Sequence, residues 1–258
     1  MSSNELISII MPCYNCEKTI AQTIDSIIMQ TYENWELLII DDASSDNSRD
    51  IVTKYMHNDN RIQLLINQSN QGVSYTRNIG VARATGNYLC FLDGDDLWPD
   101  YKLSIQLKYM QEHEVSISVG YFVDFTSDIN KGYLRKCPKK ITFNYLLNNN
   151  CVLLQTVMVS SDIKAKIHFE PQRHEDFILA LSLLKQNIVF GTIDKVLTYR
   201  RRTNDSLTAN KVRSAYWRWQ VYRKALNMSF IRSSWHLGFY IAYMMYFKLD
   251  HIIKRVGE

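Results

Sequence analysis

Four short apolar runs, separated by segments of helical character, constrain the fold of this 258-residue chain more than any other feature. The runs are rich in β-branched and aromatic residues, as strands are, and comprise Ile7–Met11, Trp35–Ile40, Ile62–Ile66 and Tyr88–Leu92. The segments between them are Thr19–Gln30, Ser48–Met56 and Val73–Ala84. Strands and helices that alternate at this length predict an α/β fold, a mostly parallel sheet with helices on both faces.

Beyond Pro99 the pattern is less regular, but further elements can be predicted. They are a helix over Asp100–Gln111, a strand over Ser116–Phe125, a helix over Glu175–Gln186 and a strand over Val189–Tyr199. With 46% hydrophobic and 22% charged residues, the composition is that of an ordinary globular protein with one large domain.

Candidate site residues follow several predicted strands at the point where each strand ends. They are Pro12, Tyr14, Asn15, Asp41, Asp42, Asp93, Asp95 and Asp96. Ligands of parallel α/β sheets gather at the carboxyl ends of the strands. We therefore expect these residues to converge on one site.

Three carboxylates stand in the four residues Asp93-Gly94-Asp95-Asp96. Like charges this close need a cation or strong hydrogen bonds to stay ionised. Carboxylate oxygens suit Mg²⁺ or Mn²⁺, which usually complete their shell with water and substrate phosphates, so a diphosphate ester is the natural ligand. The alternative is an acidic turn that caps the following helix.

Two further motifs allow two interpretations each. A carboxylate of Asp41 or Asp42 can accept a hydrogen bond from a ribose hydroxyl or a base N–H, but Asp42 or Ser44 could equally cap the next helix. Arg77 stands near the start of a predicted helix, where a guanidinium favours anionic ligands, although a lone arginine there usually faces solvent.

The cysteines and the amino terminus bear on location. Five cysteines without a regular framework fit a reducing compartment. Cys13 and Cys16 form one C-x-x-C pair without a second, which argues against zinc; thioredoxin-like chemistry stays open, and incidental packing in the pocket is the preferred interpretation. The first apolar run is too short for a signal peptide, so we expect a cytoplasmic protein.

The carboxyl-terminal part is basic and aromatic. Residues 200–258 carry twelve lysines and arginines against three acids, a net charge of +9, whereas residues 1–199 carry −5. From Lys211 the pattern is mostly helical. Trp235–Phe247 lacks charged residues but is shorter than the roughly twenty residues that span a bilayer. An interfacial helix on an anionic membrane is one interpretation, and packing on the domain or on a second subunit is the other.

Four stretches, in this order and spacing, resemble the family 2 glycosyltransferases, especially small bacterial enzymes that build O-antigen, capsule and lipopolysaccharide-core chains. The stretches are SIIMPCYNCEKTI, LLIIDDASSDNS, NQGVSYTRNIGVARATGNYLCFLDGDDLW and RHEDF. The resemblance covers about residues 6–205. It implies the GT-A fold, a Rossmann-like α/β domain, with a nucleotide diphosphate sugar donor (UDP by resemblance), a divalent cation (Mn²⁺ or Mg²⁺) and inversion at the anomeric carbon.

The resemblance also implies that different parts of the chain bind the nucleotide and the acceptor. Residues 1–99 would form the nucleotide-binding part and residues 100–205 the acceptor-binding part, followed by a helical tail over residues 206–258. The acceptor would be a saccharide, lipid-linked in many relatives, which favours peripheral contact of the tail with the inner face of the plasma membrane.

Several roles are carried over from the family to matching residues. Pro12, Tyr14 and Asn15 match the first segment of the nucleotide pocket, where the aromatic ring lies against the base. Asp41 matches the acid that contacts the base, and Asp42 its neighbour near the ribose.

Further matches concern the donor phosphates and the transfer step. Arg77 matches an arginine near the nucleotide, and Asp93 and Asp95, on either side of Gly94, match the D-x-D pair, in which the second acid ligates the metal. Asp176 is the candidate general base, which takes the proton from the attacking hydroxyl, and Glu175 positions it. Without the resemblance, Glu175 and Asp176 would be interpreted as acids at a helix N-terminus that interact favourably with the helix dipole.

The segment Tyr199–Arg202 departs from the family. Many relatives have a histidine where this chain has Arg202, so a third protein ligand to the metal is not expected. Arg200 and Arg202 would instead hold the leaving diphosphate from a flexible basic loop.

Three other functions fit these residues less well. An inactive nucleotide-binding or membrane-associated scaffold would not need the intact D-x-D pair and Asp176. A nucleotidyltransferase would need a glycine-rich phosphate loop with lysine, where this chain has ProCysTyrAsnCys. A nucleic-acid binder would rest on the charge of the tail alone, so we expect no nucleic-acid partner.

Overall fold

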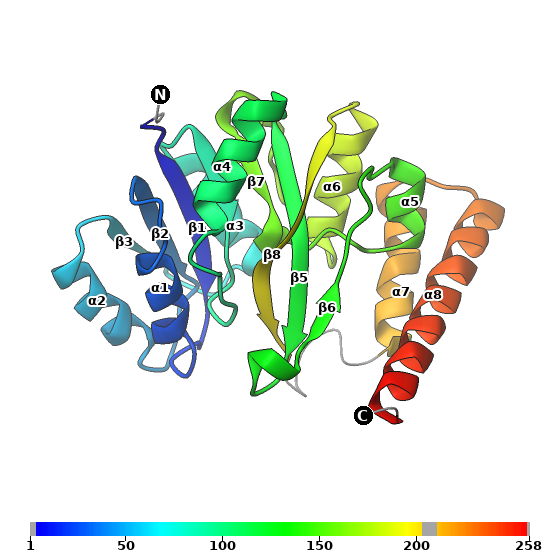
Figure 1. Ribbon diagram of the computed structural model, residues 1–258, viewed down its shortest axis with the longest axis horizontal. Helices are drawn as coiled ribbons and strands as arrows, with labels where there is room; N and C mark the ends of the chain where they lie inside the picture. The colour runs from blue at the N-terminus through cyan, green and yellow to red at the C-terminus, as the bar shows by residue number, and fades with distance from the viewer. Residues whose placement is uncertain (1–3, 203–210, 257–258) are drawn as a thin grey trace.

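The computed structural model describes the backbone of residues 4–202 and 211–256, and the side chains of these except residues 211, 212 and 244–256. Within this part of the chain eight strands form one sheet (Figure 1). The strands are β1 (Ile7–Cys13), β2 (Trp35–Asp41), β3 (Ile62–Ile66), β4 (Tyr88–Phe91), β5 (Ile117–Phe125), β6 (Tyr133–Arg135), β7 (Met158–Ser160) and β8 (Phe190–Arg201).

Helices flank the sheet. They are α1 (Ile20–Ile28), α2 (Ser48–Asn58), α3 (Val73–Arg83), α4 (Lys102–His113), α5 (Phe143–Asn148), α6 (Glu175–Lys185), α7 (Lys211–Gln220) and α8 (Phe230–Val256). Short helical turns are η1 (Ile129–Lys131), η2 (Leu154–Thr156), η3 (Ser161–Lys166) and the π-helical η4 (Val221–Ala225).

The sheet runs in the order β3-β2-β1-β4-β7-β5-β6, and β8 pairs with β5. The pairs β1 with β2, β1 with β4, β2 with β3 and β5 with β8 are parallel, whereas β6 and β7 are antiparallel to their partners. The predicted, mostly parallel sheet is confirmed. The sequence did not predict β6, β7 or α5, because elements of three to six residues are too short to show a periodic pattern.

Both faces of the central strands are buried. Successive side chains of a strand point to opposite faces, so Ile9 belongs to a core with α1 and α4, and Ile10 to a core with α6. Every residue of β2 is buried. Because both faces of the central strands are covered, we expect the site at the carboxyl ends of these strands and at the helices that begin there.

The tail lies beside the domain. Helices α7 and α8 stand together at one end of the molecule, next to α5 and opposite α2 and β3 (Figure 1). Val221 and Tyr222 are buried in the core that contains α6. Of the two interpretations of the tail, packing on the domain therefore holds for this part. The predicted boundary at residue 206 lies outside the described residues.

Gly80 lets α3 lie close to the sheet, which suggests a first test. A Cβ atom at Gly80 would overlap the side chain of Ile10 and lie 2.9 Å from Cδ1 of Ile40. We expect Gly80→Ala to lower the free energy of unfolding by about 1–3 kcal/mol, because overpacked cores shift side chains and backbone. Urea unfolding should show a lower midpoint at an unchanged slope.

Gly238→Ala is the matched control, because no atom lies within 4 Å of an added Cβ in this exposed part of α8. It should be neutral or stabilise by up to about 1 kcal/mol, through the higher helix propensity of alanine. Equal effects of both substitutions would contradict close packing at Gly80.

Candidate active site

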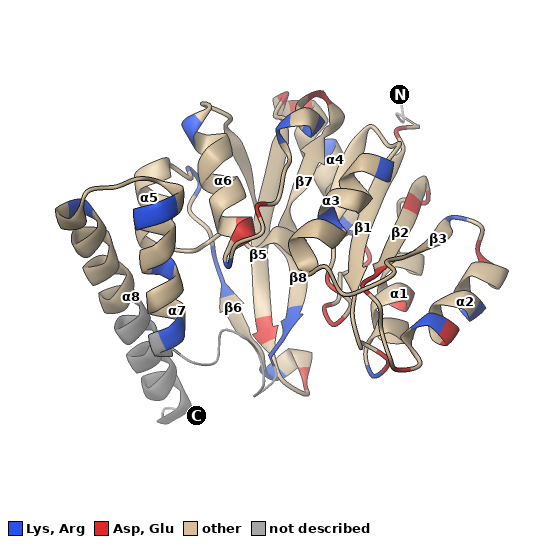
Figure 2. Cartoon of the chain, turned by 180° about the vertical axis from the view of Figure 1, so that it is seen from behind, with Lys and Arg blue, Asp and Glu red and all other residues tan. Residues whose placement is uncertain are grey.

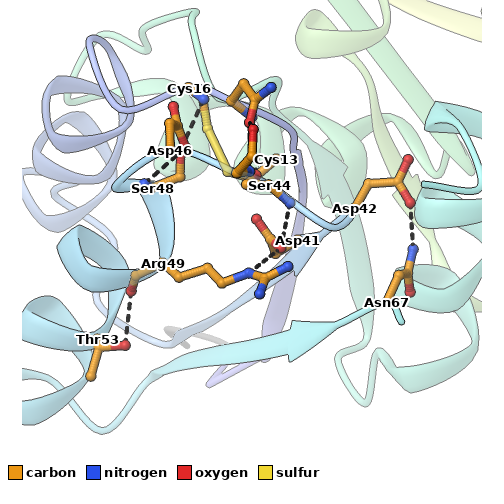
Figure 3. Close-up of polar contacts among 12 residues, drawn as sticks. Cys13, Cys16, Asp41, Asp42, Ser44, Asp46, Ser48, Arg49, Thr53 and Asn67 are labelled. Atoms are coloured by element: carbon orange, nitrogen blue, oxygen red, sulfur yellow. Dashed lines mark hydrogen bonds and ion pairs between the residues drawn. A yellow bond between two sulfur atoms is a disulfide. The ribbon is translucent and has the colours of Figure 1, made fainter. Parts of the chain in front are cut away.

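The loops after β1 and β2 bring the first group of predicted residues together (Figure 3). Asp41 is only 1% exposed, and its Oδ2 accepts hydrogen bonds from Arg49 Nε at 2.6 Å and the Ser44 amide at 3.0 Å. Its Oδ1 is buried and has no partner among the described residues. A buried acceptor at the end of a central strand can receive a base N–H or a ribose hydroxyl.

The loop after β1 presents an aromatic ring. Asn15 has φ of 50°, in the left-handed region that asparagine tolerates. Its amide donates to Ser44 Oγ at 3.0 Å, and its Oδ1 accepts from the Ser45 amide at 2.9 Å. Pro12 is half-buried in β1, whereas Tyr14 is 53% exposed. The ring of Tyr14 is thus accessible to a base.

A disulfide joins Cys13 and Cys16 in this loop (Figure 3). The expectation that the two cysteines only pack in the pocket is wrong. The turn after β1 brings both sulfur atoms together. The remaining cysteines are buried and free; they are Cys90, Cys137 and Cys151.

Gly94, predicted at the donor site, allows close approach of two loops. A Cβ atom there would lie 3.1 Å from Cys16 Sγ, and the Gly94 carbonyl accepts a hydrogen bond from Thr19 Oγ1 at 2.8 Å. The lack of a side chain therefore lets the D-x-D loop pack against the loop that carries Tyr14.

Asp42 holds the loop before α3. Its Oδ1 accepts from Asn67 Nδ2 at 2.8 Å and the Gln71 amide at 2.9 Å, and its Oδ2 accepts from the Gly72 amide at 2.8 Å. The side chain is 4% exposed. Asp42 therefore holds the backbone in front of α3 and does not cap α2, whose N-cap is Asn47. The ribose contact that the resemblance implies stays a prediction.

Arg77 joins the two acidic motifs. It is buried, its Nη2 donates to Asp93 Oδ1 at 2.7 Å, and its Nη1 donates to Glu175 Oε1 at 2.6 Å. Burial alone would lower the pKa of Arg77, but the charges of Asp93 and Glu175 raise it, so the guanidinium stays charged. Both terminal nitrogens of Arg77 bind carboxylates of the protein, and the place near the nucleotide that the resemblance implies stays a prediction.

Gln155 is a second partner of the D-x-D motif. The side-chain Nε2 of Gln155 donates a hydrogen bond to Asp93 Oδ2. Its backbone carbonyl accepts hydrogen bonds from Trp98 Nε1 at 3.0 Å and from Thr198 Oγ1 at 2.8 Å. Gln155 could not be predicted from the sequence, because the three-residue helical turn that contains it carries no motif. Only the fold brings η2 to the end of β4.

Asp95 carries the carboxylate best placed for a cation. Solvent reaches it, yet desolvation by surrounding protein atoms, and then the charge of Asp93, raise its pKa to about 6. No other side chain of the described residues donates a hydrogen bond to its carboxylate or forms an ion pair with it, although its own backbone amide lies close enough to favour the charged form. Asp96 is buried and accepts a hydrogen bond from the Arg201 amide at 2.8 Å. Burial, and then the charges of Asp95 and Asp93, raise the pKa of Asp96 well above its usual range.

This donor set fits a divalent ion that is shared with a substrate. No group of three or more His, Cys, Asp or Glu side chains close enough to hold a metal occurs in the described part of the chain. Mg²⁺ and Mn²⁺ are commonly held by one or two carboxylates and completed by substrate phosphates. Asp95 would be the protein ligand, since Arg77 and Gln155 already occupy Asp93.

The three arginines at the end of β8 differ in their surroundings. Arg200 makes two hydrogen bonds to Asp124, at 2.6 and 2.9 Å, and the Arg202 amide donates to β5 at 2.7 Å. Arg201, which was not predicted, donates from Nε to the Asp95 carbonyl at 3.1 Å. The expected flexible loop is corrected: Arg200 and Arg201 belong to a strand, whose alternation turns Arg201 toward the D-x-D loop.

Glu175 and Asp176 begin α6. Burial, and then the charge of Asp176, raise the pKa of Glu175 against the opposing charge of Arg77. Asp176 Oδ1 accepts from the Phe177 amide at 2.7 Å, as an acid in a first helical turn does. The helix-dipole alternative explains that contact, but it does not explain the ion pair of Glu175 with Arg77.

A family model described as "Glycosyl transferase family 2" matches residues 8–165, which is more than half of the chain. The chain is a family 2 glycosyltransferase.

Two relatives of this glycosyltransferase come from Escherichia coli, and both are called UDP-Glc:alpha-D-GlcNAc-diphosphoundecaprenol beta-1,3-glucosyltransferase. WfgD is 36% identical over 217 residues, 84% of this chain and 85% of WfgD. WfaP is 34% identical over 208 residues, 80% of this chain and 81% of WfaP. This chain therefore matches these two relatives over most of their length.

The fold also has known counterparts. The mannosyltransferase PcManGT from Pyrobaculum calidifontis, solved in complex with GDP-Man and Mn²⁺, superposes with a TM-score of 0.69 and 18% identity, over 92% of this chain and 73% of PcManGT. At that identity the likeness shows the fold alone. The predicted GT-A fold of this glycosyltransferase is confirmed.

The cation site can be tested by thermal unfolding. We expect Mn²⁺ to raise the Tm of the wild type by several degrees when UDP is present, because a ligand that binds only the folded state stabilises it. Asp95→Asn should abolish most of this shift. Asp100→Asn, in an exposed acid nearby, is the control and should retain it. A full shift in Asp95→Asn would show that the ion binds elsewhere.

Proposed function

We propose that this glycosyltransferase is a metal-dependent inverting hexosyltransferase that moves a hexose or N-acetylhexosamine from UDP to a lipid-linked saccharide in bacterial surface polysaccharide biosynthesis. One observation carries this proposal. Arg77 binds Asp93 of the D-x-D motif and Glu175 of the Glu-Asp motif together, so the donor and acceptor motifs form one site.

The nucleotide would lie over the loops after β1 and β2. Tyr14 offers an exposed ring for the base, and Asp41 offers a buried, unpartnered oxygen for a polar hydrogen. The names of WfgD and WfaP, which specify UDP-glucose, support uridine as the base.

The diphosphate would lie against the D-x-D loop. A divalent cation there would neutralise the charge that develops on the leaving UDP. Asp95 would hold that cation, because it is the accessible acid of the motif and its carboxylate has no side-chain partner among the described residues. Arg201 would fix the loop through the Asp95 carbonyl.

Asp176 would act as the base. Its Oδ1 is held by the Phe177 amide, while Glu175 is turned to Arg77, so the two carboxylates are separated in function. The acceptor hydroxyl would lose its proton to Asp176 as it attacks the anomeric carbon. The β-linkage in the names of WfgD and WfaP, formed from an α-linked donor, supports inversion.

Asp176→Asn tests the base. We expect kcat to fall by about 10²–10⁴, the usual contribution of general base catalysis, while UDP affinity stays unchanged. The assay would follow UDP release from a panel of UDP-sugars with undecaprenyl-diphosphate-linked N-acetylglucosamine, and calorimetry would measure UDP binding. Asp194→Asn is the control, because Asp194 is an exposed acid that accepts a hydrogen bond from the Tyr121 hydroxyl. Full activity of Asp176→Asn would exclude it as the base.

A scaffold without turnover is the other class of function. It would bind UDP and release nothing from any donor, with or without the acceptor. The Glu175–Asp176 pair, which Arg77 joins to Asp93, disfavours the scaffold. A protein that only binds nucleotide has no use for an acidic pair across the site from the D-x-D loop.

We also propose that the tail contacts the cytoplasmic face of the plasma membrane. No helix in the described part of the chain is long and apolar enough to cross a bilayer. The exposed face of α8, which we call the α8 ridge, consists of Phe230, Ile231, Trp235 and Phe239, exposed by 66, 81, 66 and 46%. Such apolar side chains next to basic residues suit the surface of an anionic membrane.

Charge supports this contact. Basic residues occupy α7 and the turn into α8 (Figure 2). Arg223, Lys224 and Arg232 are exposed close to the α8 ridge. Each basic residue near an anionic surface adds about 1 kcal/mol of attraction.

A double substitution tests the membrane contact. Ile231→Glu with Trp235→Glu should lower binding to phosphatidylglycerol vesicles by about tenfold or more, because each buried apolar side chain contributes about 1.5–3 kcal/mol. Cosedimentation with vesicles would measure it. Val189→Glu is the control, since Val189 is 70% exposed outside the tail. Equal binding of the double variant and the wild type would contradict the proposal.

A further inference from the structure

The residue in front of the Glu-Asp motif is held by the tail. His174 has φ of 64°, in the left-handed region, directly before Glu175. Its ring packs edge-to-face on Trp217 of α7, with centroids 6.2 Å apart, and it forms a hydrogen bond with the backbone of Ser214. A non-glycine residue keeps this conformation only where its surroundings hold it. The start of α6 therefore depends on α7.

Arg218 of α7 lies buried between two aromatic rings. It is 1% exposed, and its guanidinium carbon lies 3.6 Å from the ring centroid of Phe177 in α6 and 4.5 Å from that of Tyr240 in α8. Its Nε and Nη1 have no hydrogen-bond partner among the described residues. A buried cation without a carboxylate is costly, and two ring faces offset only part of that cost.

We propose that Arg218 is a positioning residue that keeps the first turn of α6 in place, with Glu175 turned toward Arg77 and Asp176 beside it. The inference rests on the proposed function for its catalytic meaning. Phe177 follows Asp176 directly, so a guanidinium stacked on that ring fixes the first turn of α6. An apolar residue of similar size could fill the same space, which leaves the charge of Arg218 to be explained.

The charge acts on His174. Burial, and then the positive charge of Arg218, lower the pKa of His174 to about 4, with Arg173 acting in the same direction and Glu175 against it. The imidazole is therefore neutral near pH 7. A protonated His174 would be a second cation beside Glu175 and would compete with Arg77 for its carboxylate.

Arg218→Met in the full-length chain separates charge from volume. Without the cation, the pKa of His174 should rise toward its usual 6.5, so that more imidazole is protonated as the pH falls. We expect kcat at about pH 6 to fall by up to about fourfold, the loss that protonation of a group with a pKa of about 6.5 would cause, and to stay nearly unchanged at about pH 8, whereas the KM for UDP-glucose and the affinity for UDP stay within about twofold. Arg218→Lys keeps the charge and should keep the pH profile.

A second variant identifies His174 as the intermediary. Asparagine tolerates the left-handed region and cannot be protonated, so His174→Asn combined with Arg218→Met should restore the kcat of the His174→Asn single variant at about pH 6. A double variant that is still impaired, or a single Arg218→Met variant with the wild-type pH profile, would overturn the proposal.

A readout without turnover keeps the inference separate from the proposed function. An NMR titration of the His174 ring, assigned through His174→Asn, should show its pKa rise in Arg218→Met. If no donor is turned over by the wild type, the proposed function fails, and this titration still decides the link between Arg218 and His174. An unchanged pKa in a folded Arg218→Met variant would overturn that link.

Discussion

The two ion pairs of the buried Arg77 hold the active site together. They join Asp93, at the end of β4, to Glu175, which is 98 residues away from Arg77 at the start of α6. Removing one member of a buried pair usually costs about 3–5 kcal/mol, because the remaining charge loses its partner. Arg77 therefore serves stability and function at once, since the same contacts that close the fold also place the carboxylates.

The charge balance around Arg77 explains why the neighbouring acids differ. Asp93 forms an ion pair with Arg77 and accepts a hydrogen bond from Gln155, whereas Asp95 has no side-chain partner among the described residues and has a raised pKa. One acid of the motif thus orients the loop, and the other keeps its carboxylate available for a cation. This division follows from position alone, because the two residues are chemically identical and only Gly94 separates them.

The sequence predicted the parallel half of the sheet and the strand ends at which the candidate site residues lie, because strands that end in polar residues are a local pattern. It did not predict which oxygens would be occupied. Within the protein, Asp42 holds the loop before α3 and Arg200 pairs with Asp124, whereas the expected contacts of Asp42 with the ribose and of Arg200 with the diphosphate stay predictions. Gln155 and Arg201 were missed, because their roles depend on partners far along the chain.

The sequence by itself determined the family, the α/β fold and the positions of the acidic motifs, since each follows from residue types at short spacing. Tertiary structure alone decided that Arg77 bridges two motifs, that Cys13 and Cys16 are joined, and that the tail reaches the start of α6. The physical reason is that an ion pair, a disulfide or a stacked ring needs two atoms within a few ångströms. Such closeness between distant segments exists only after the chain has folded.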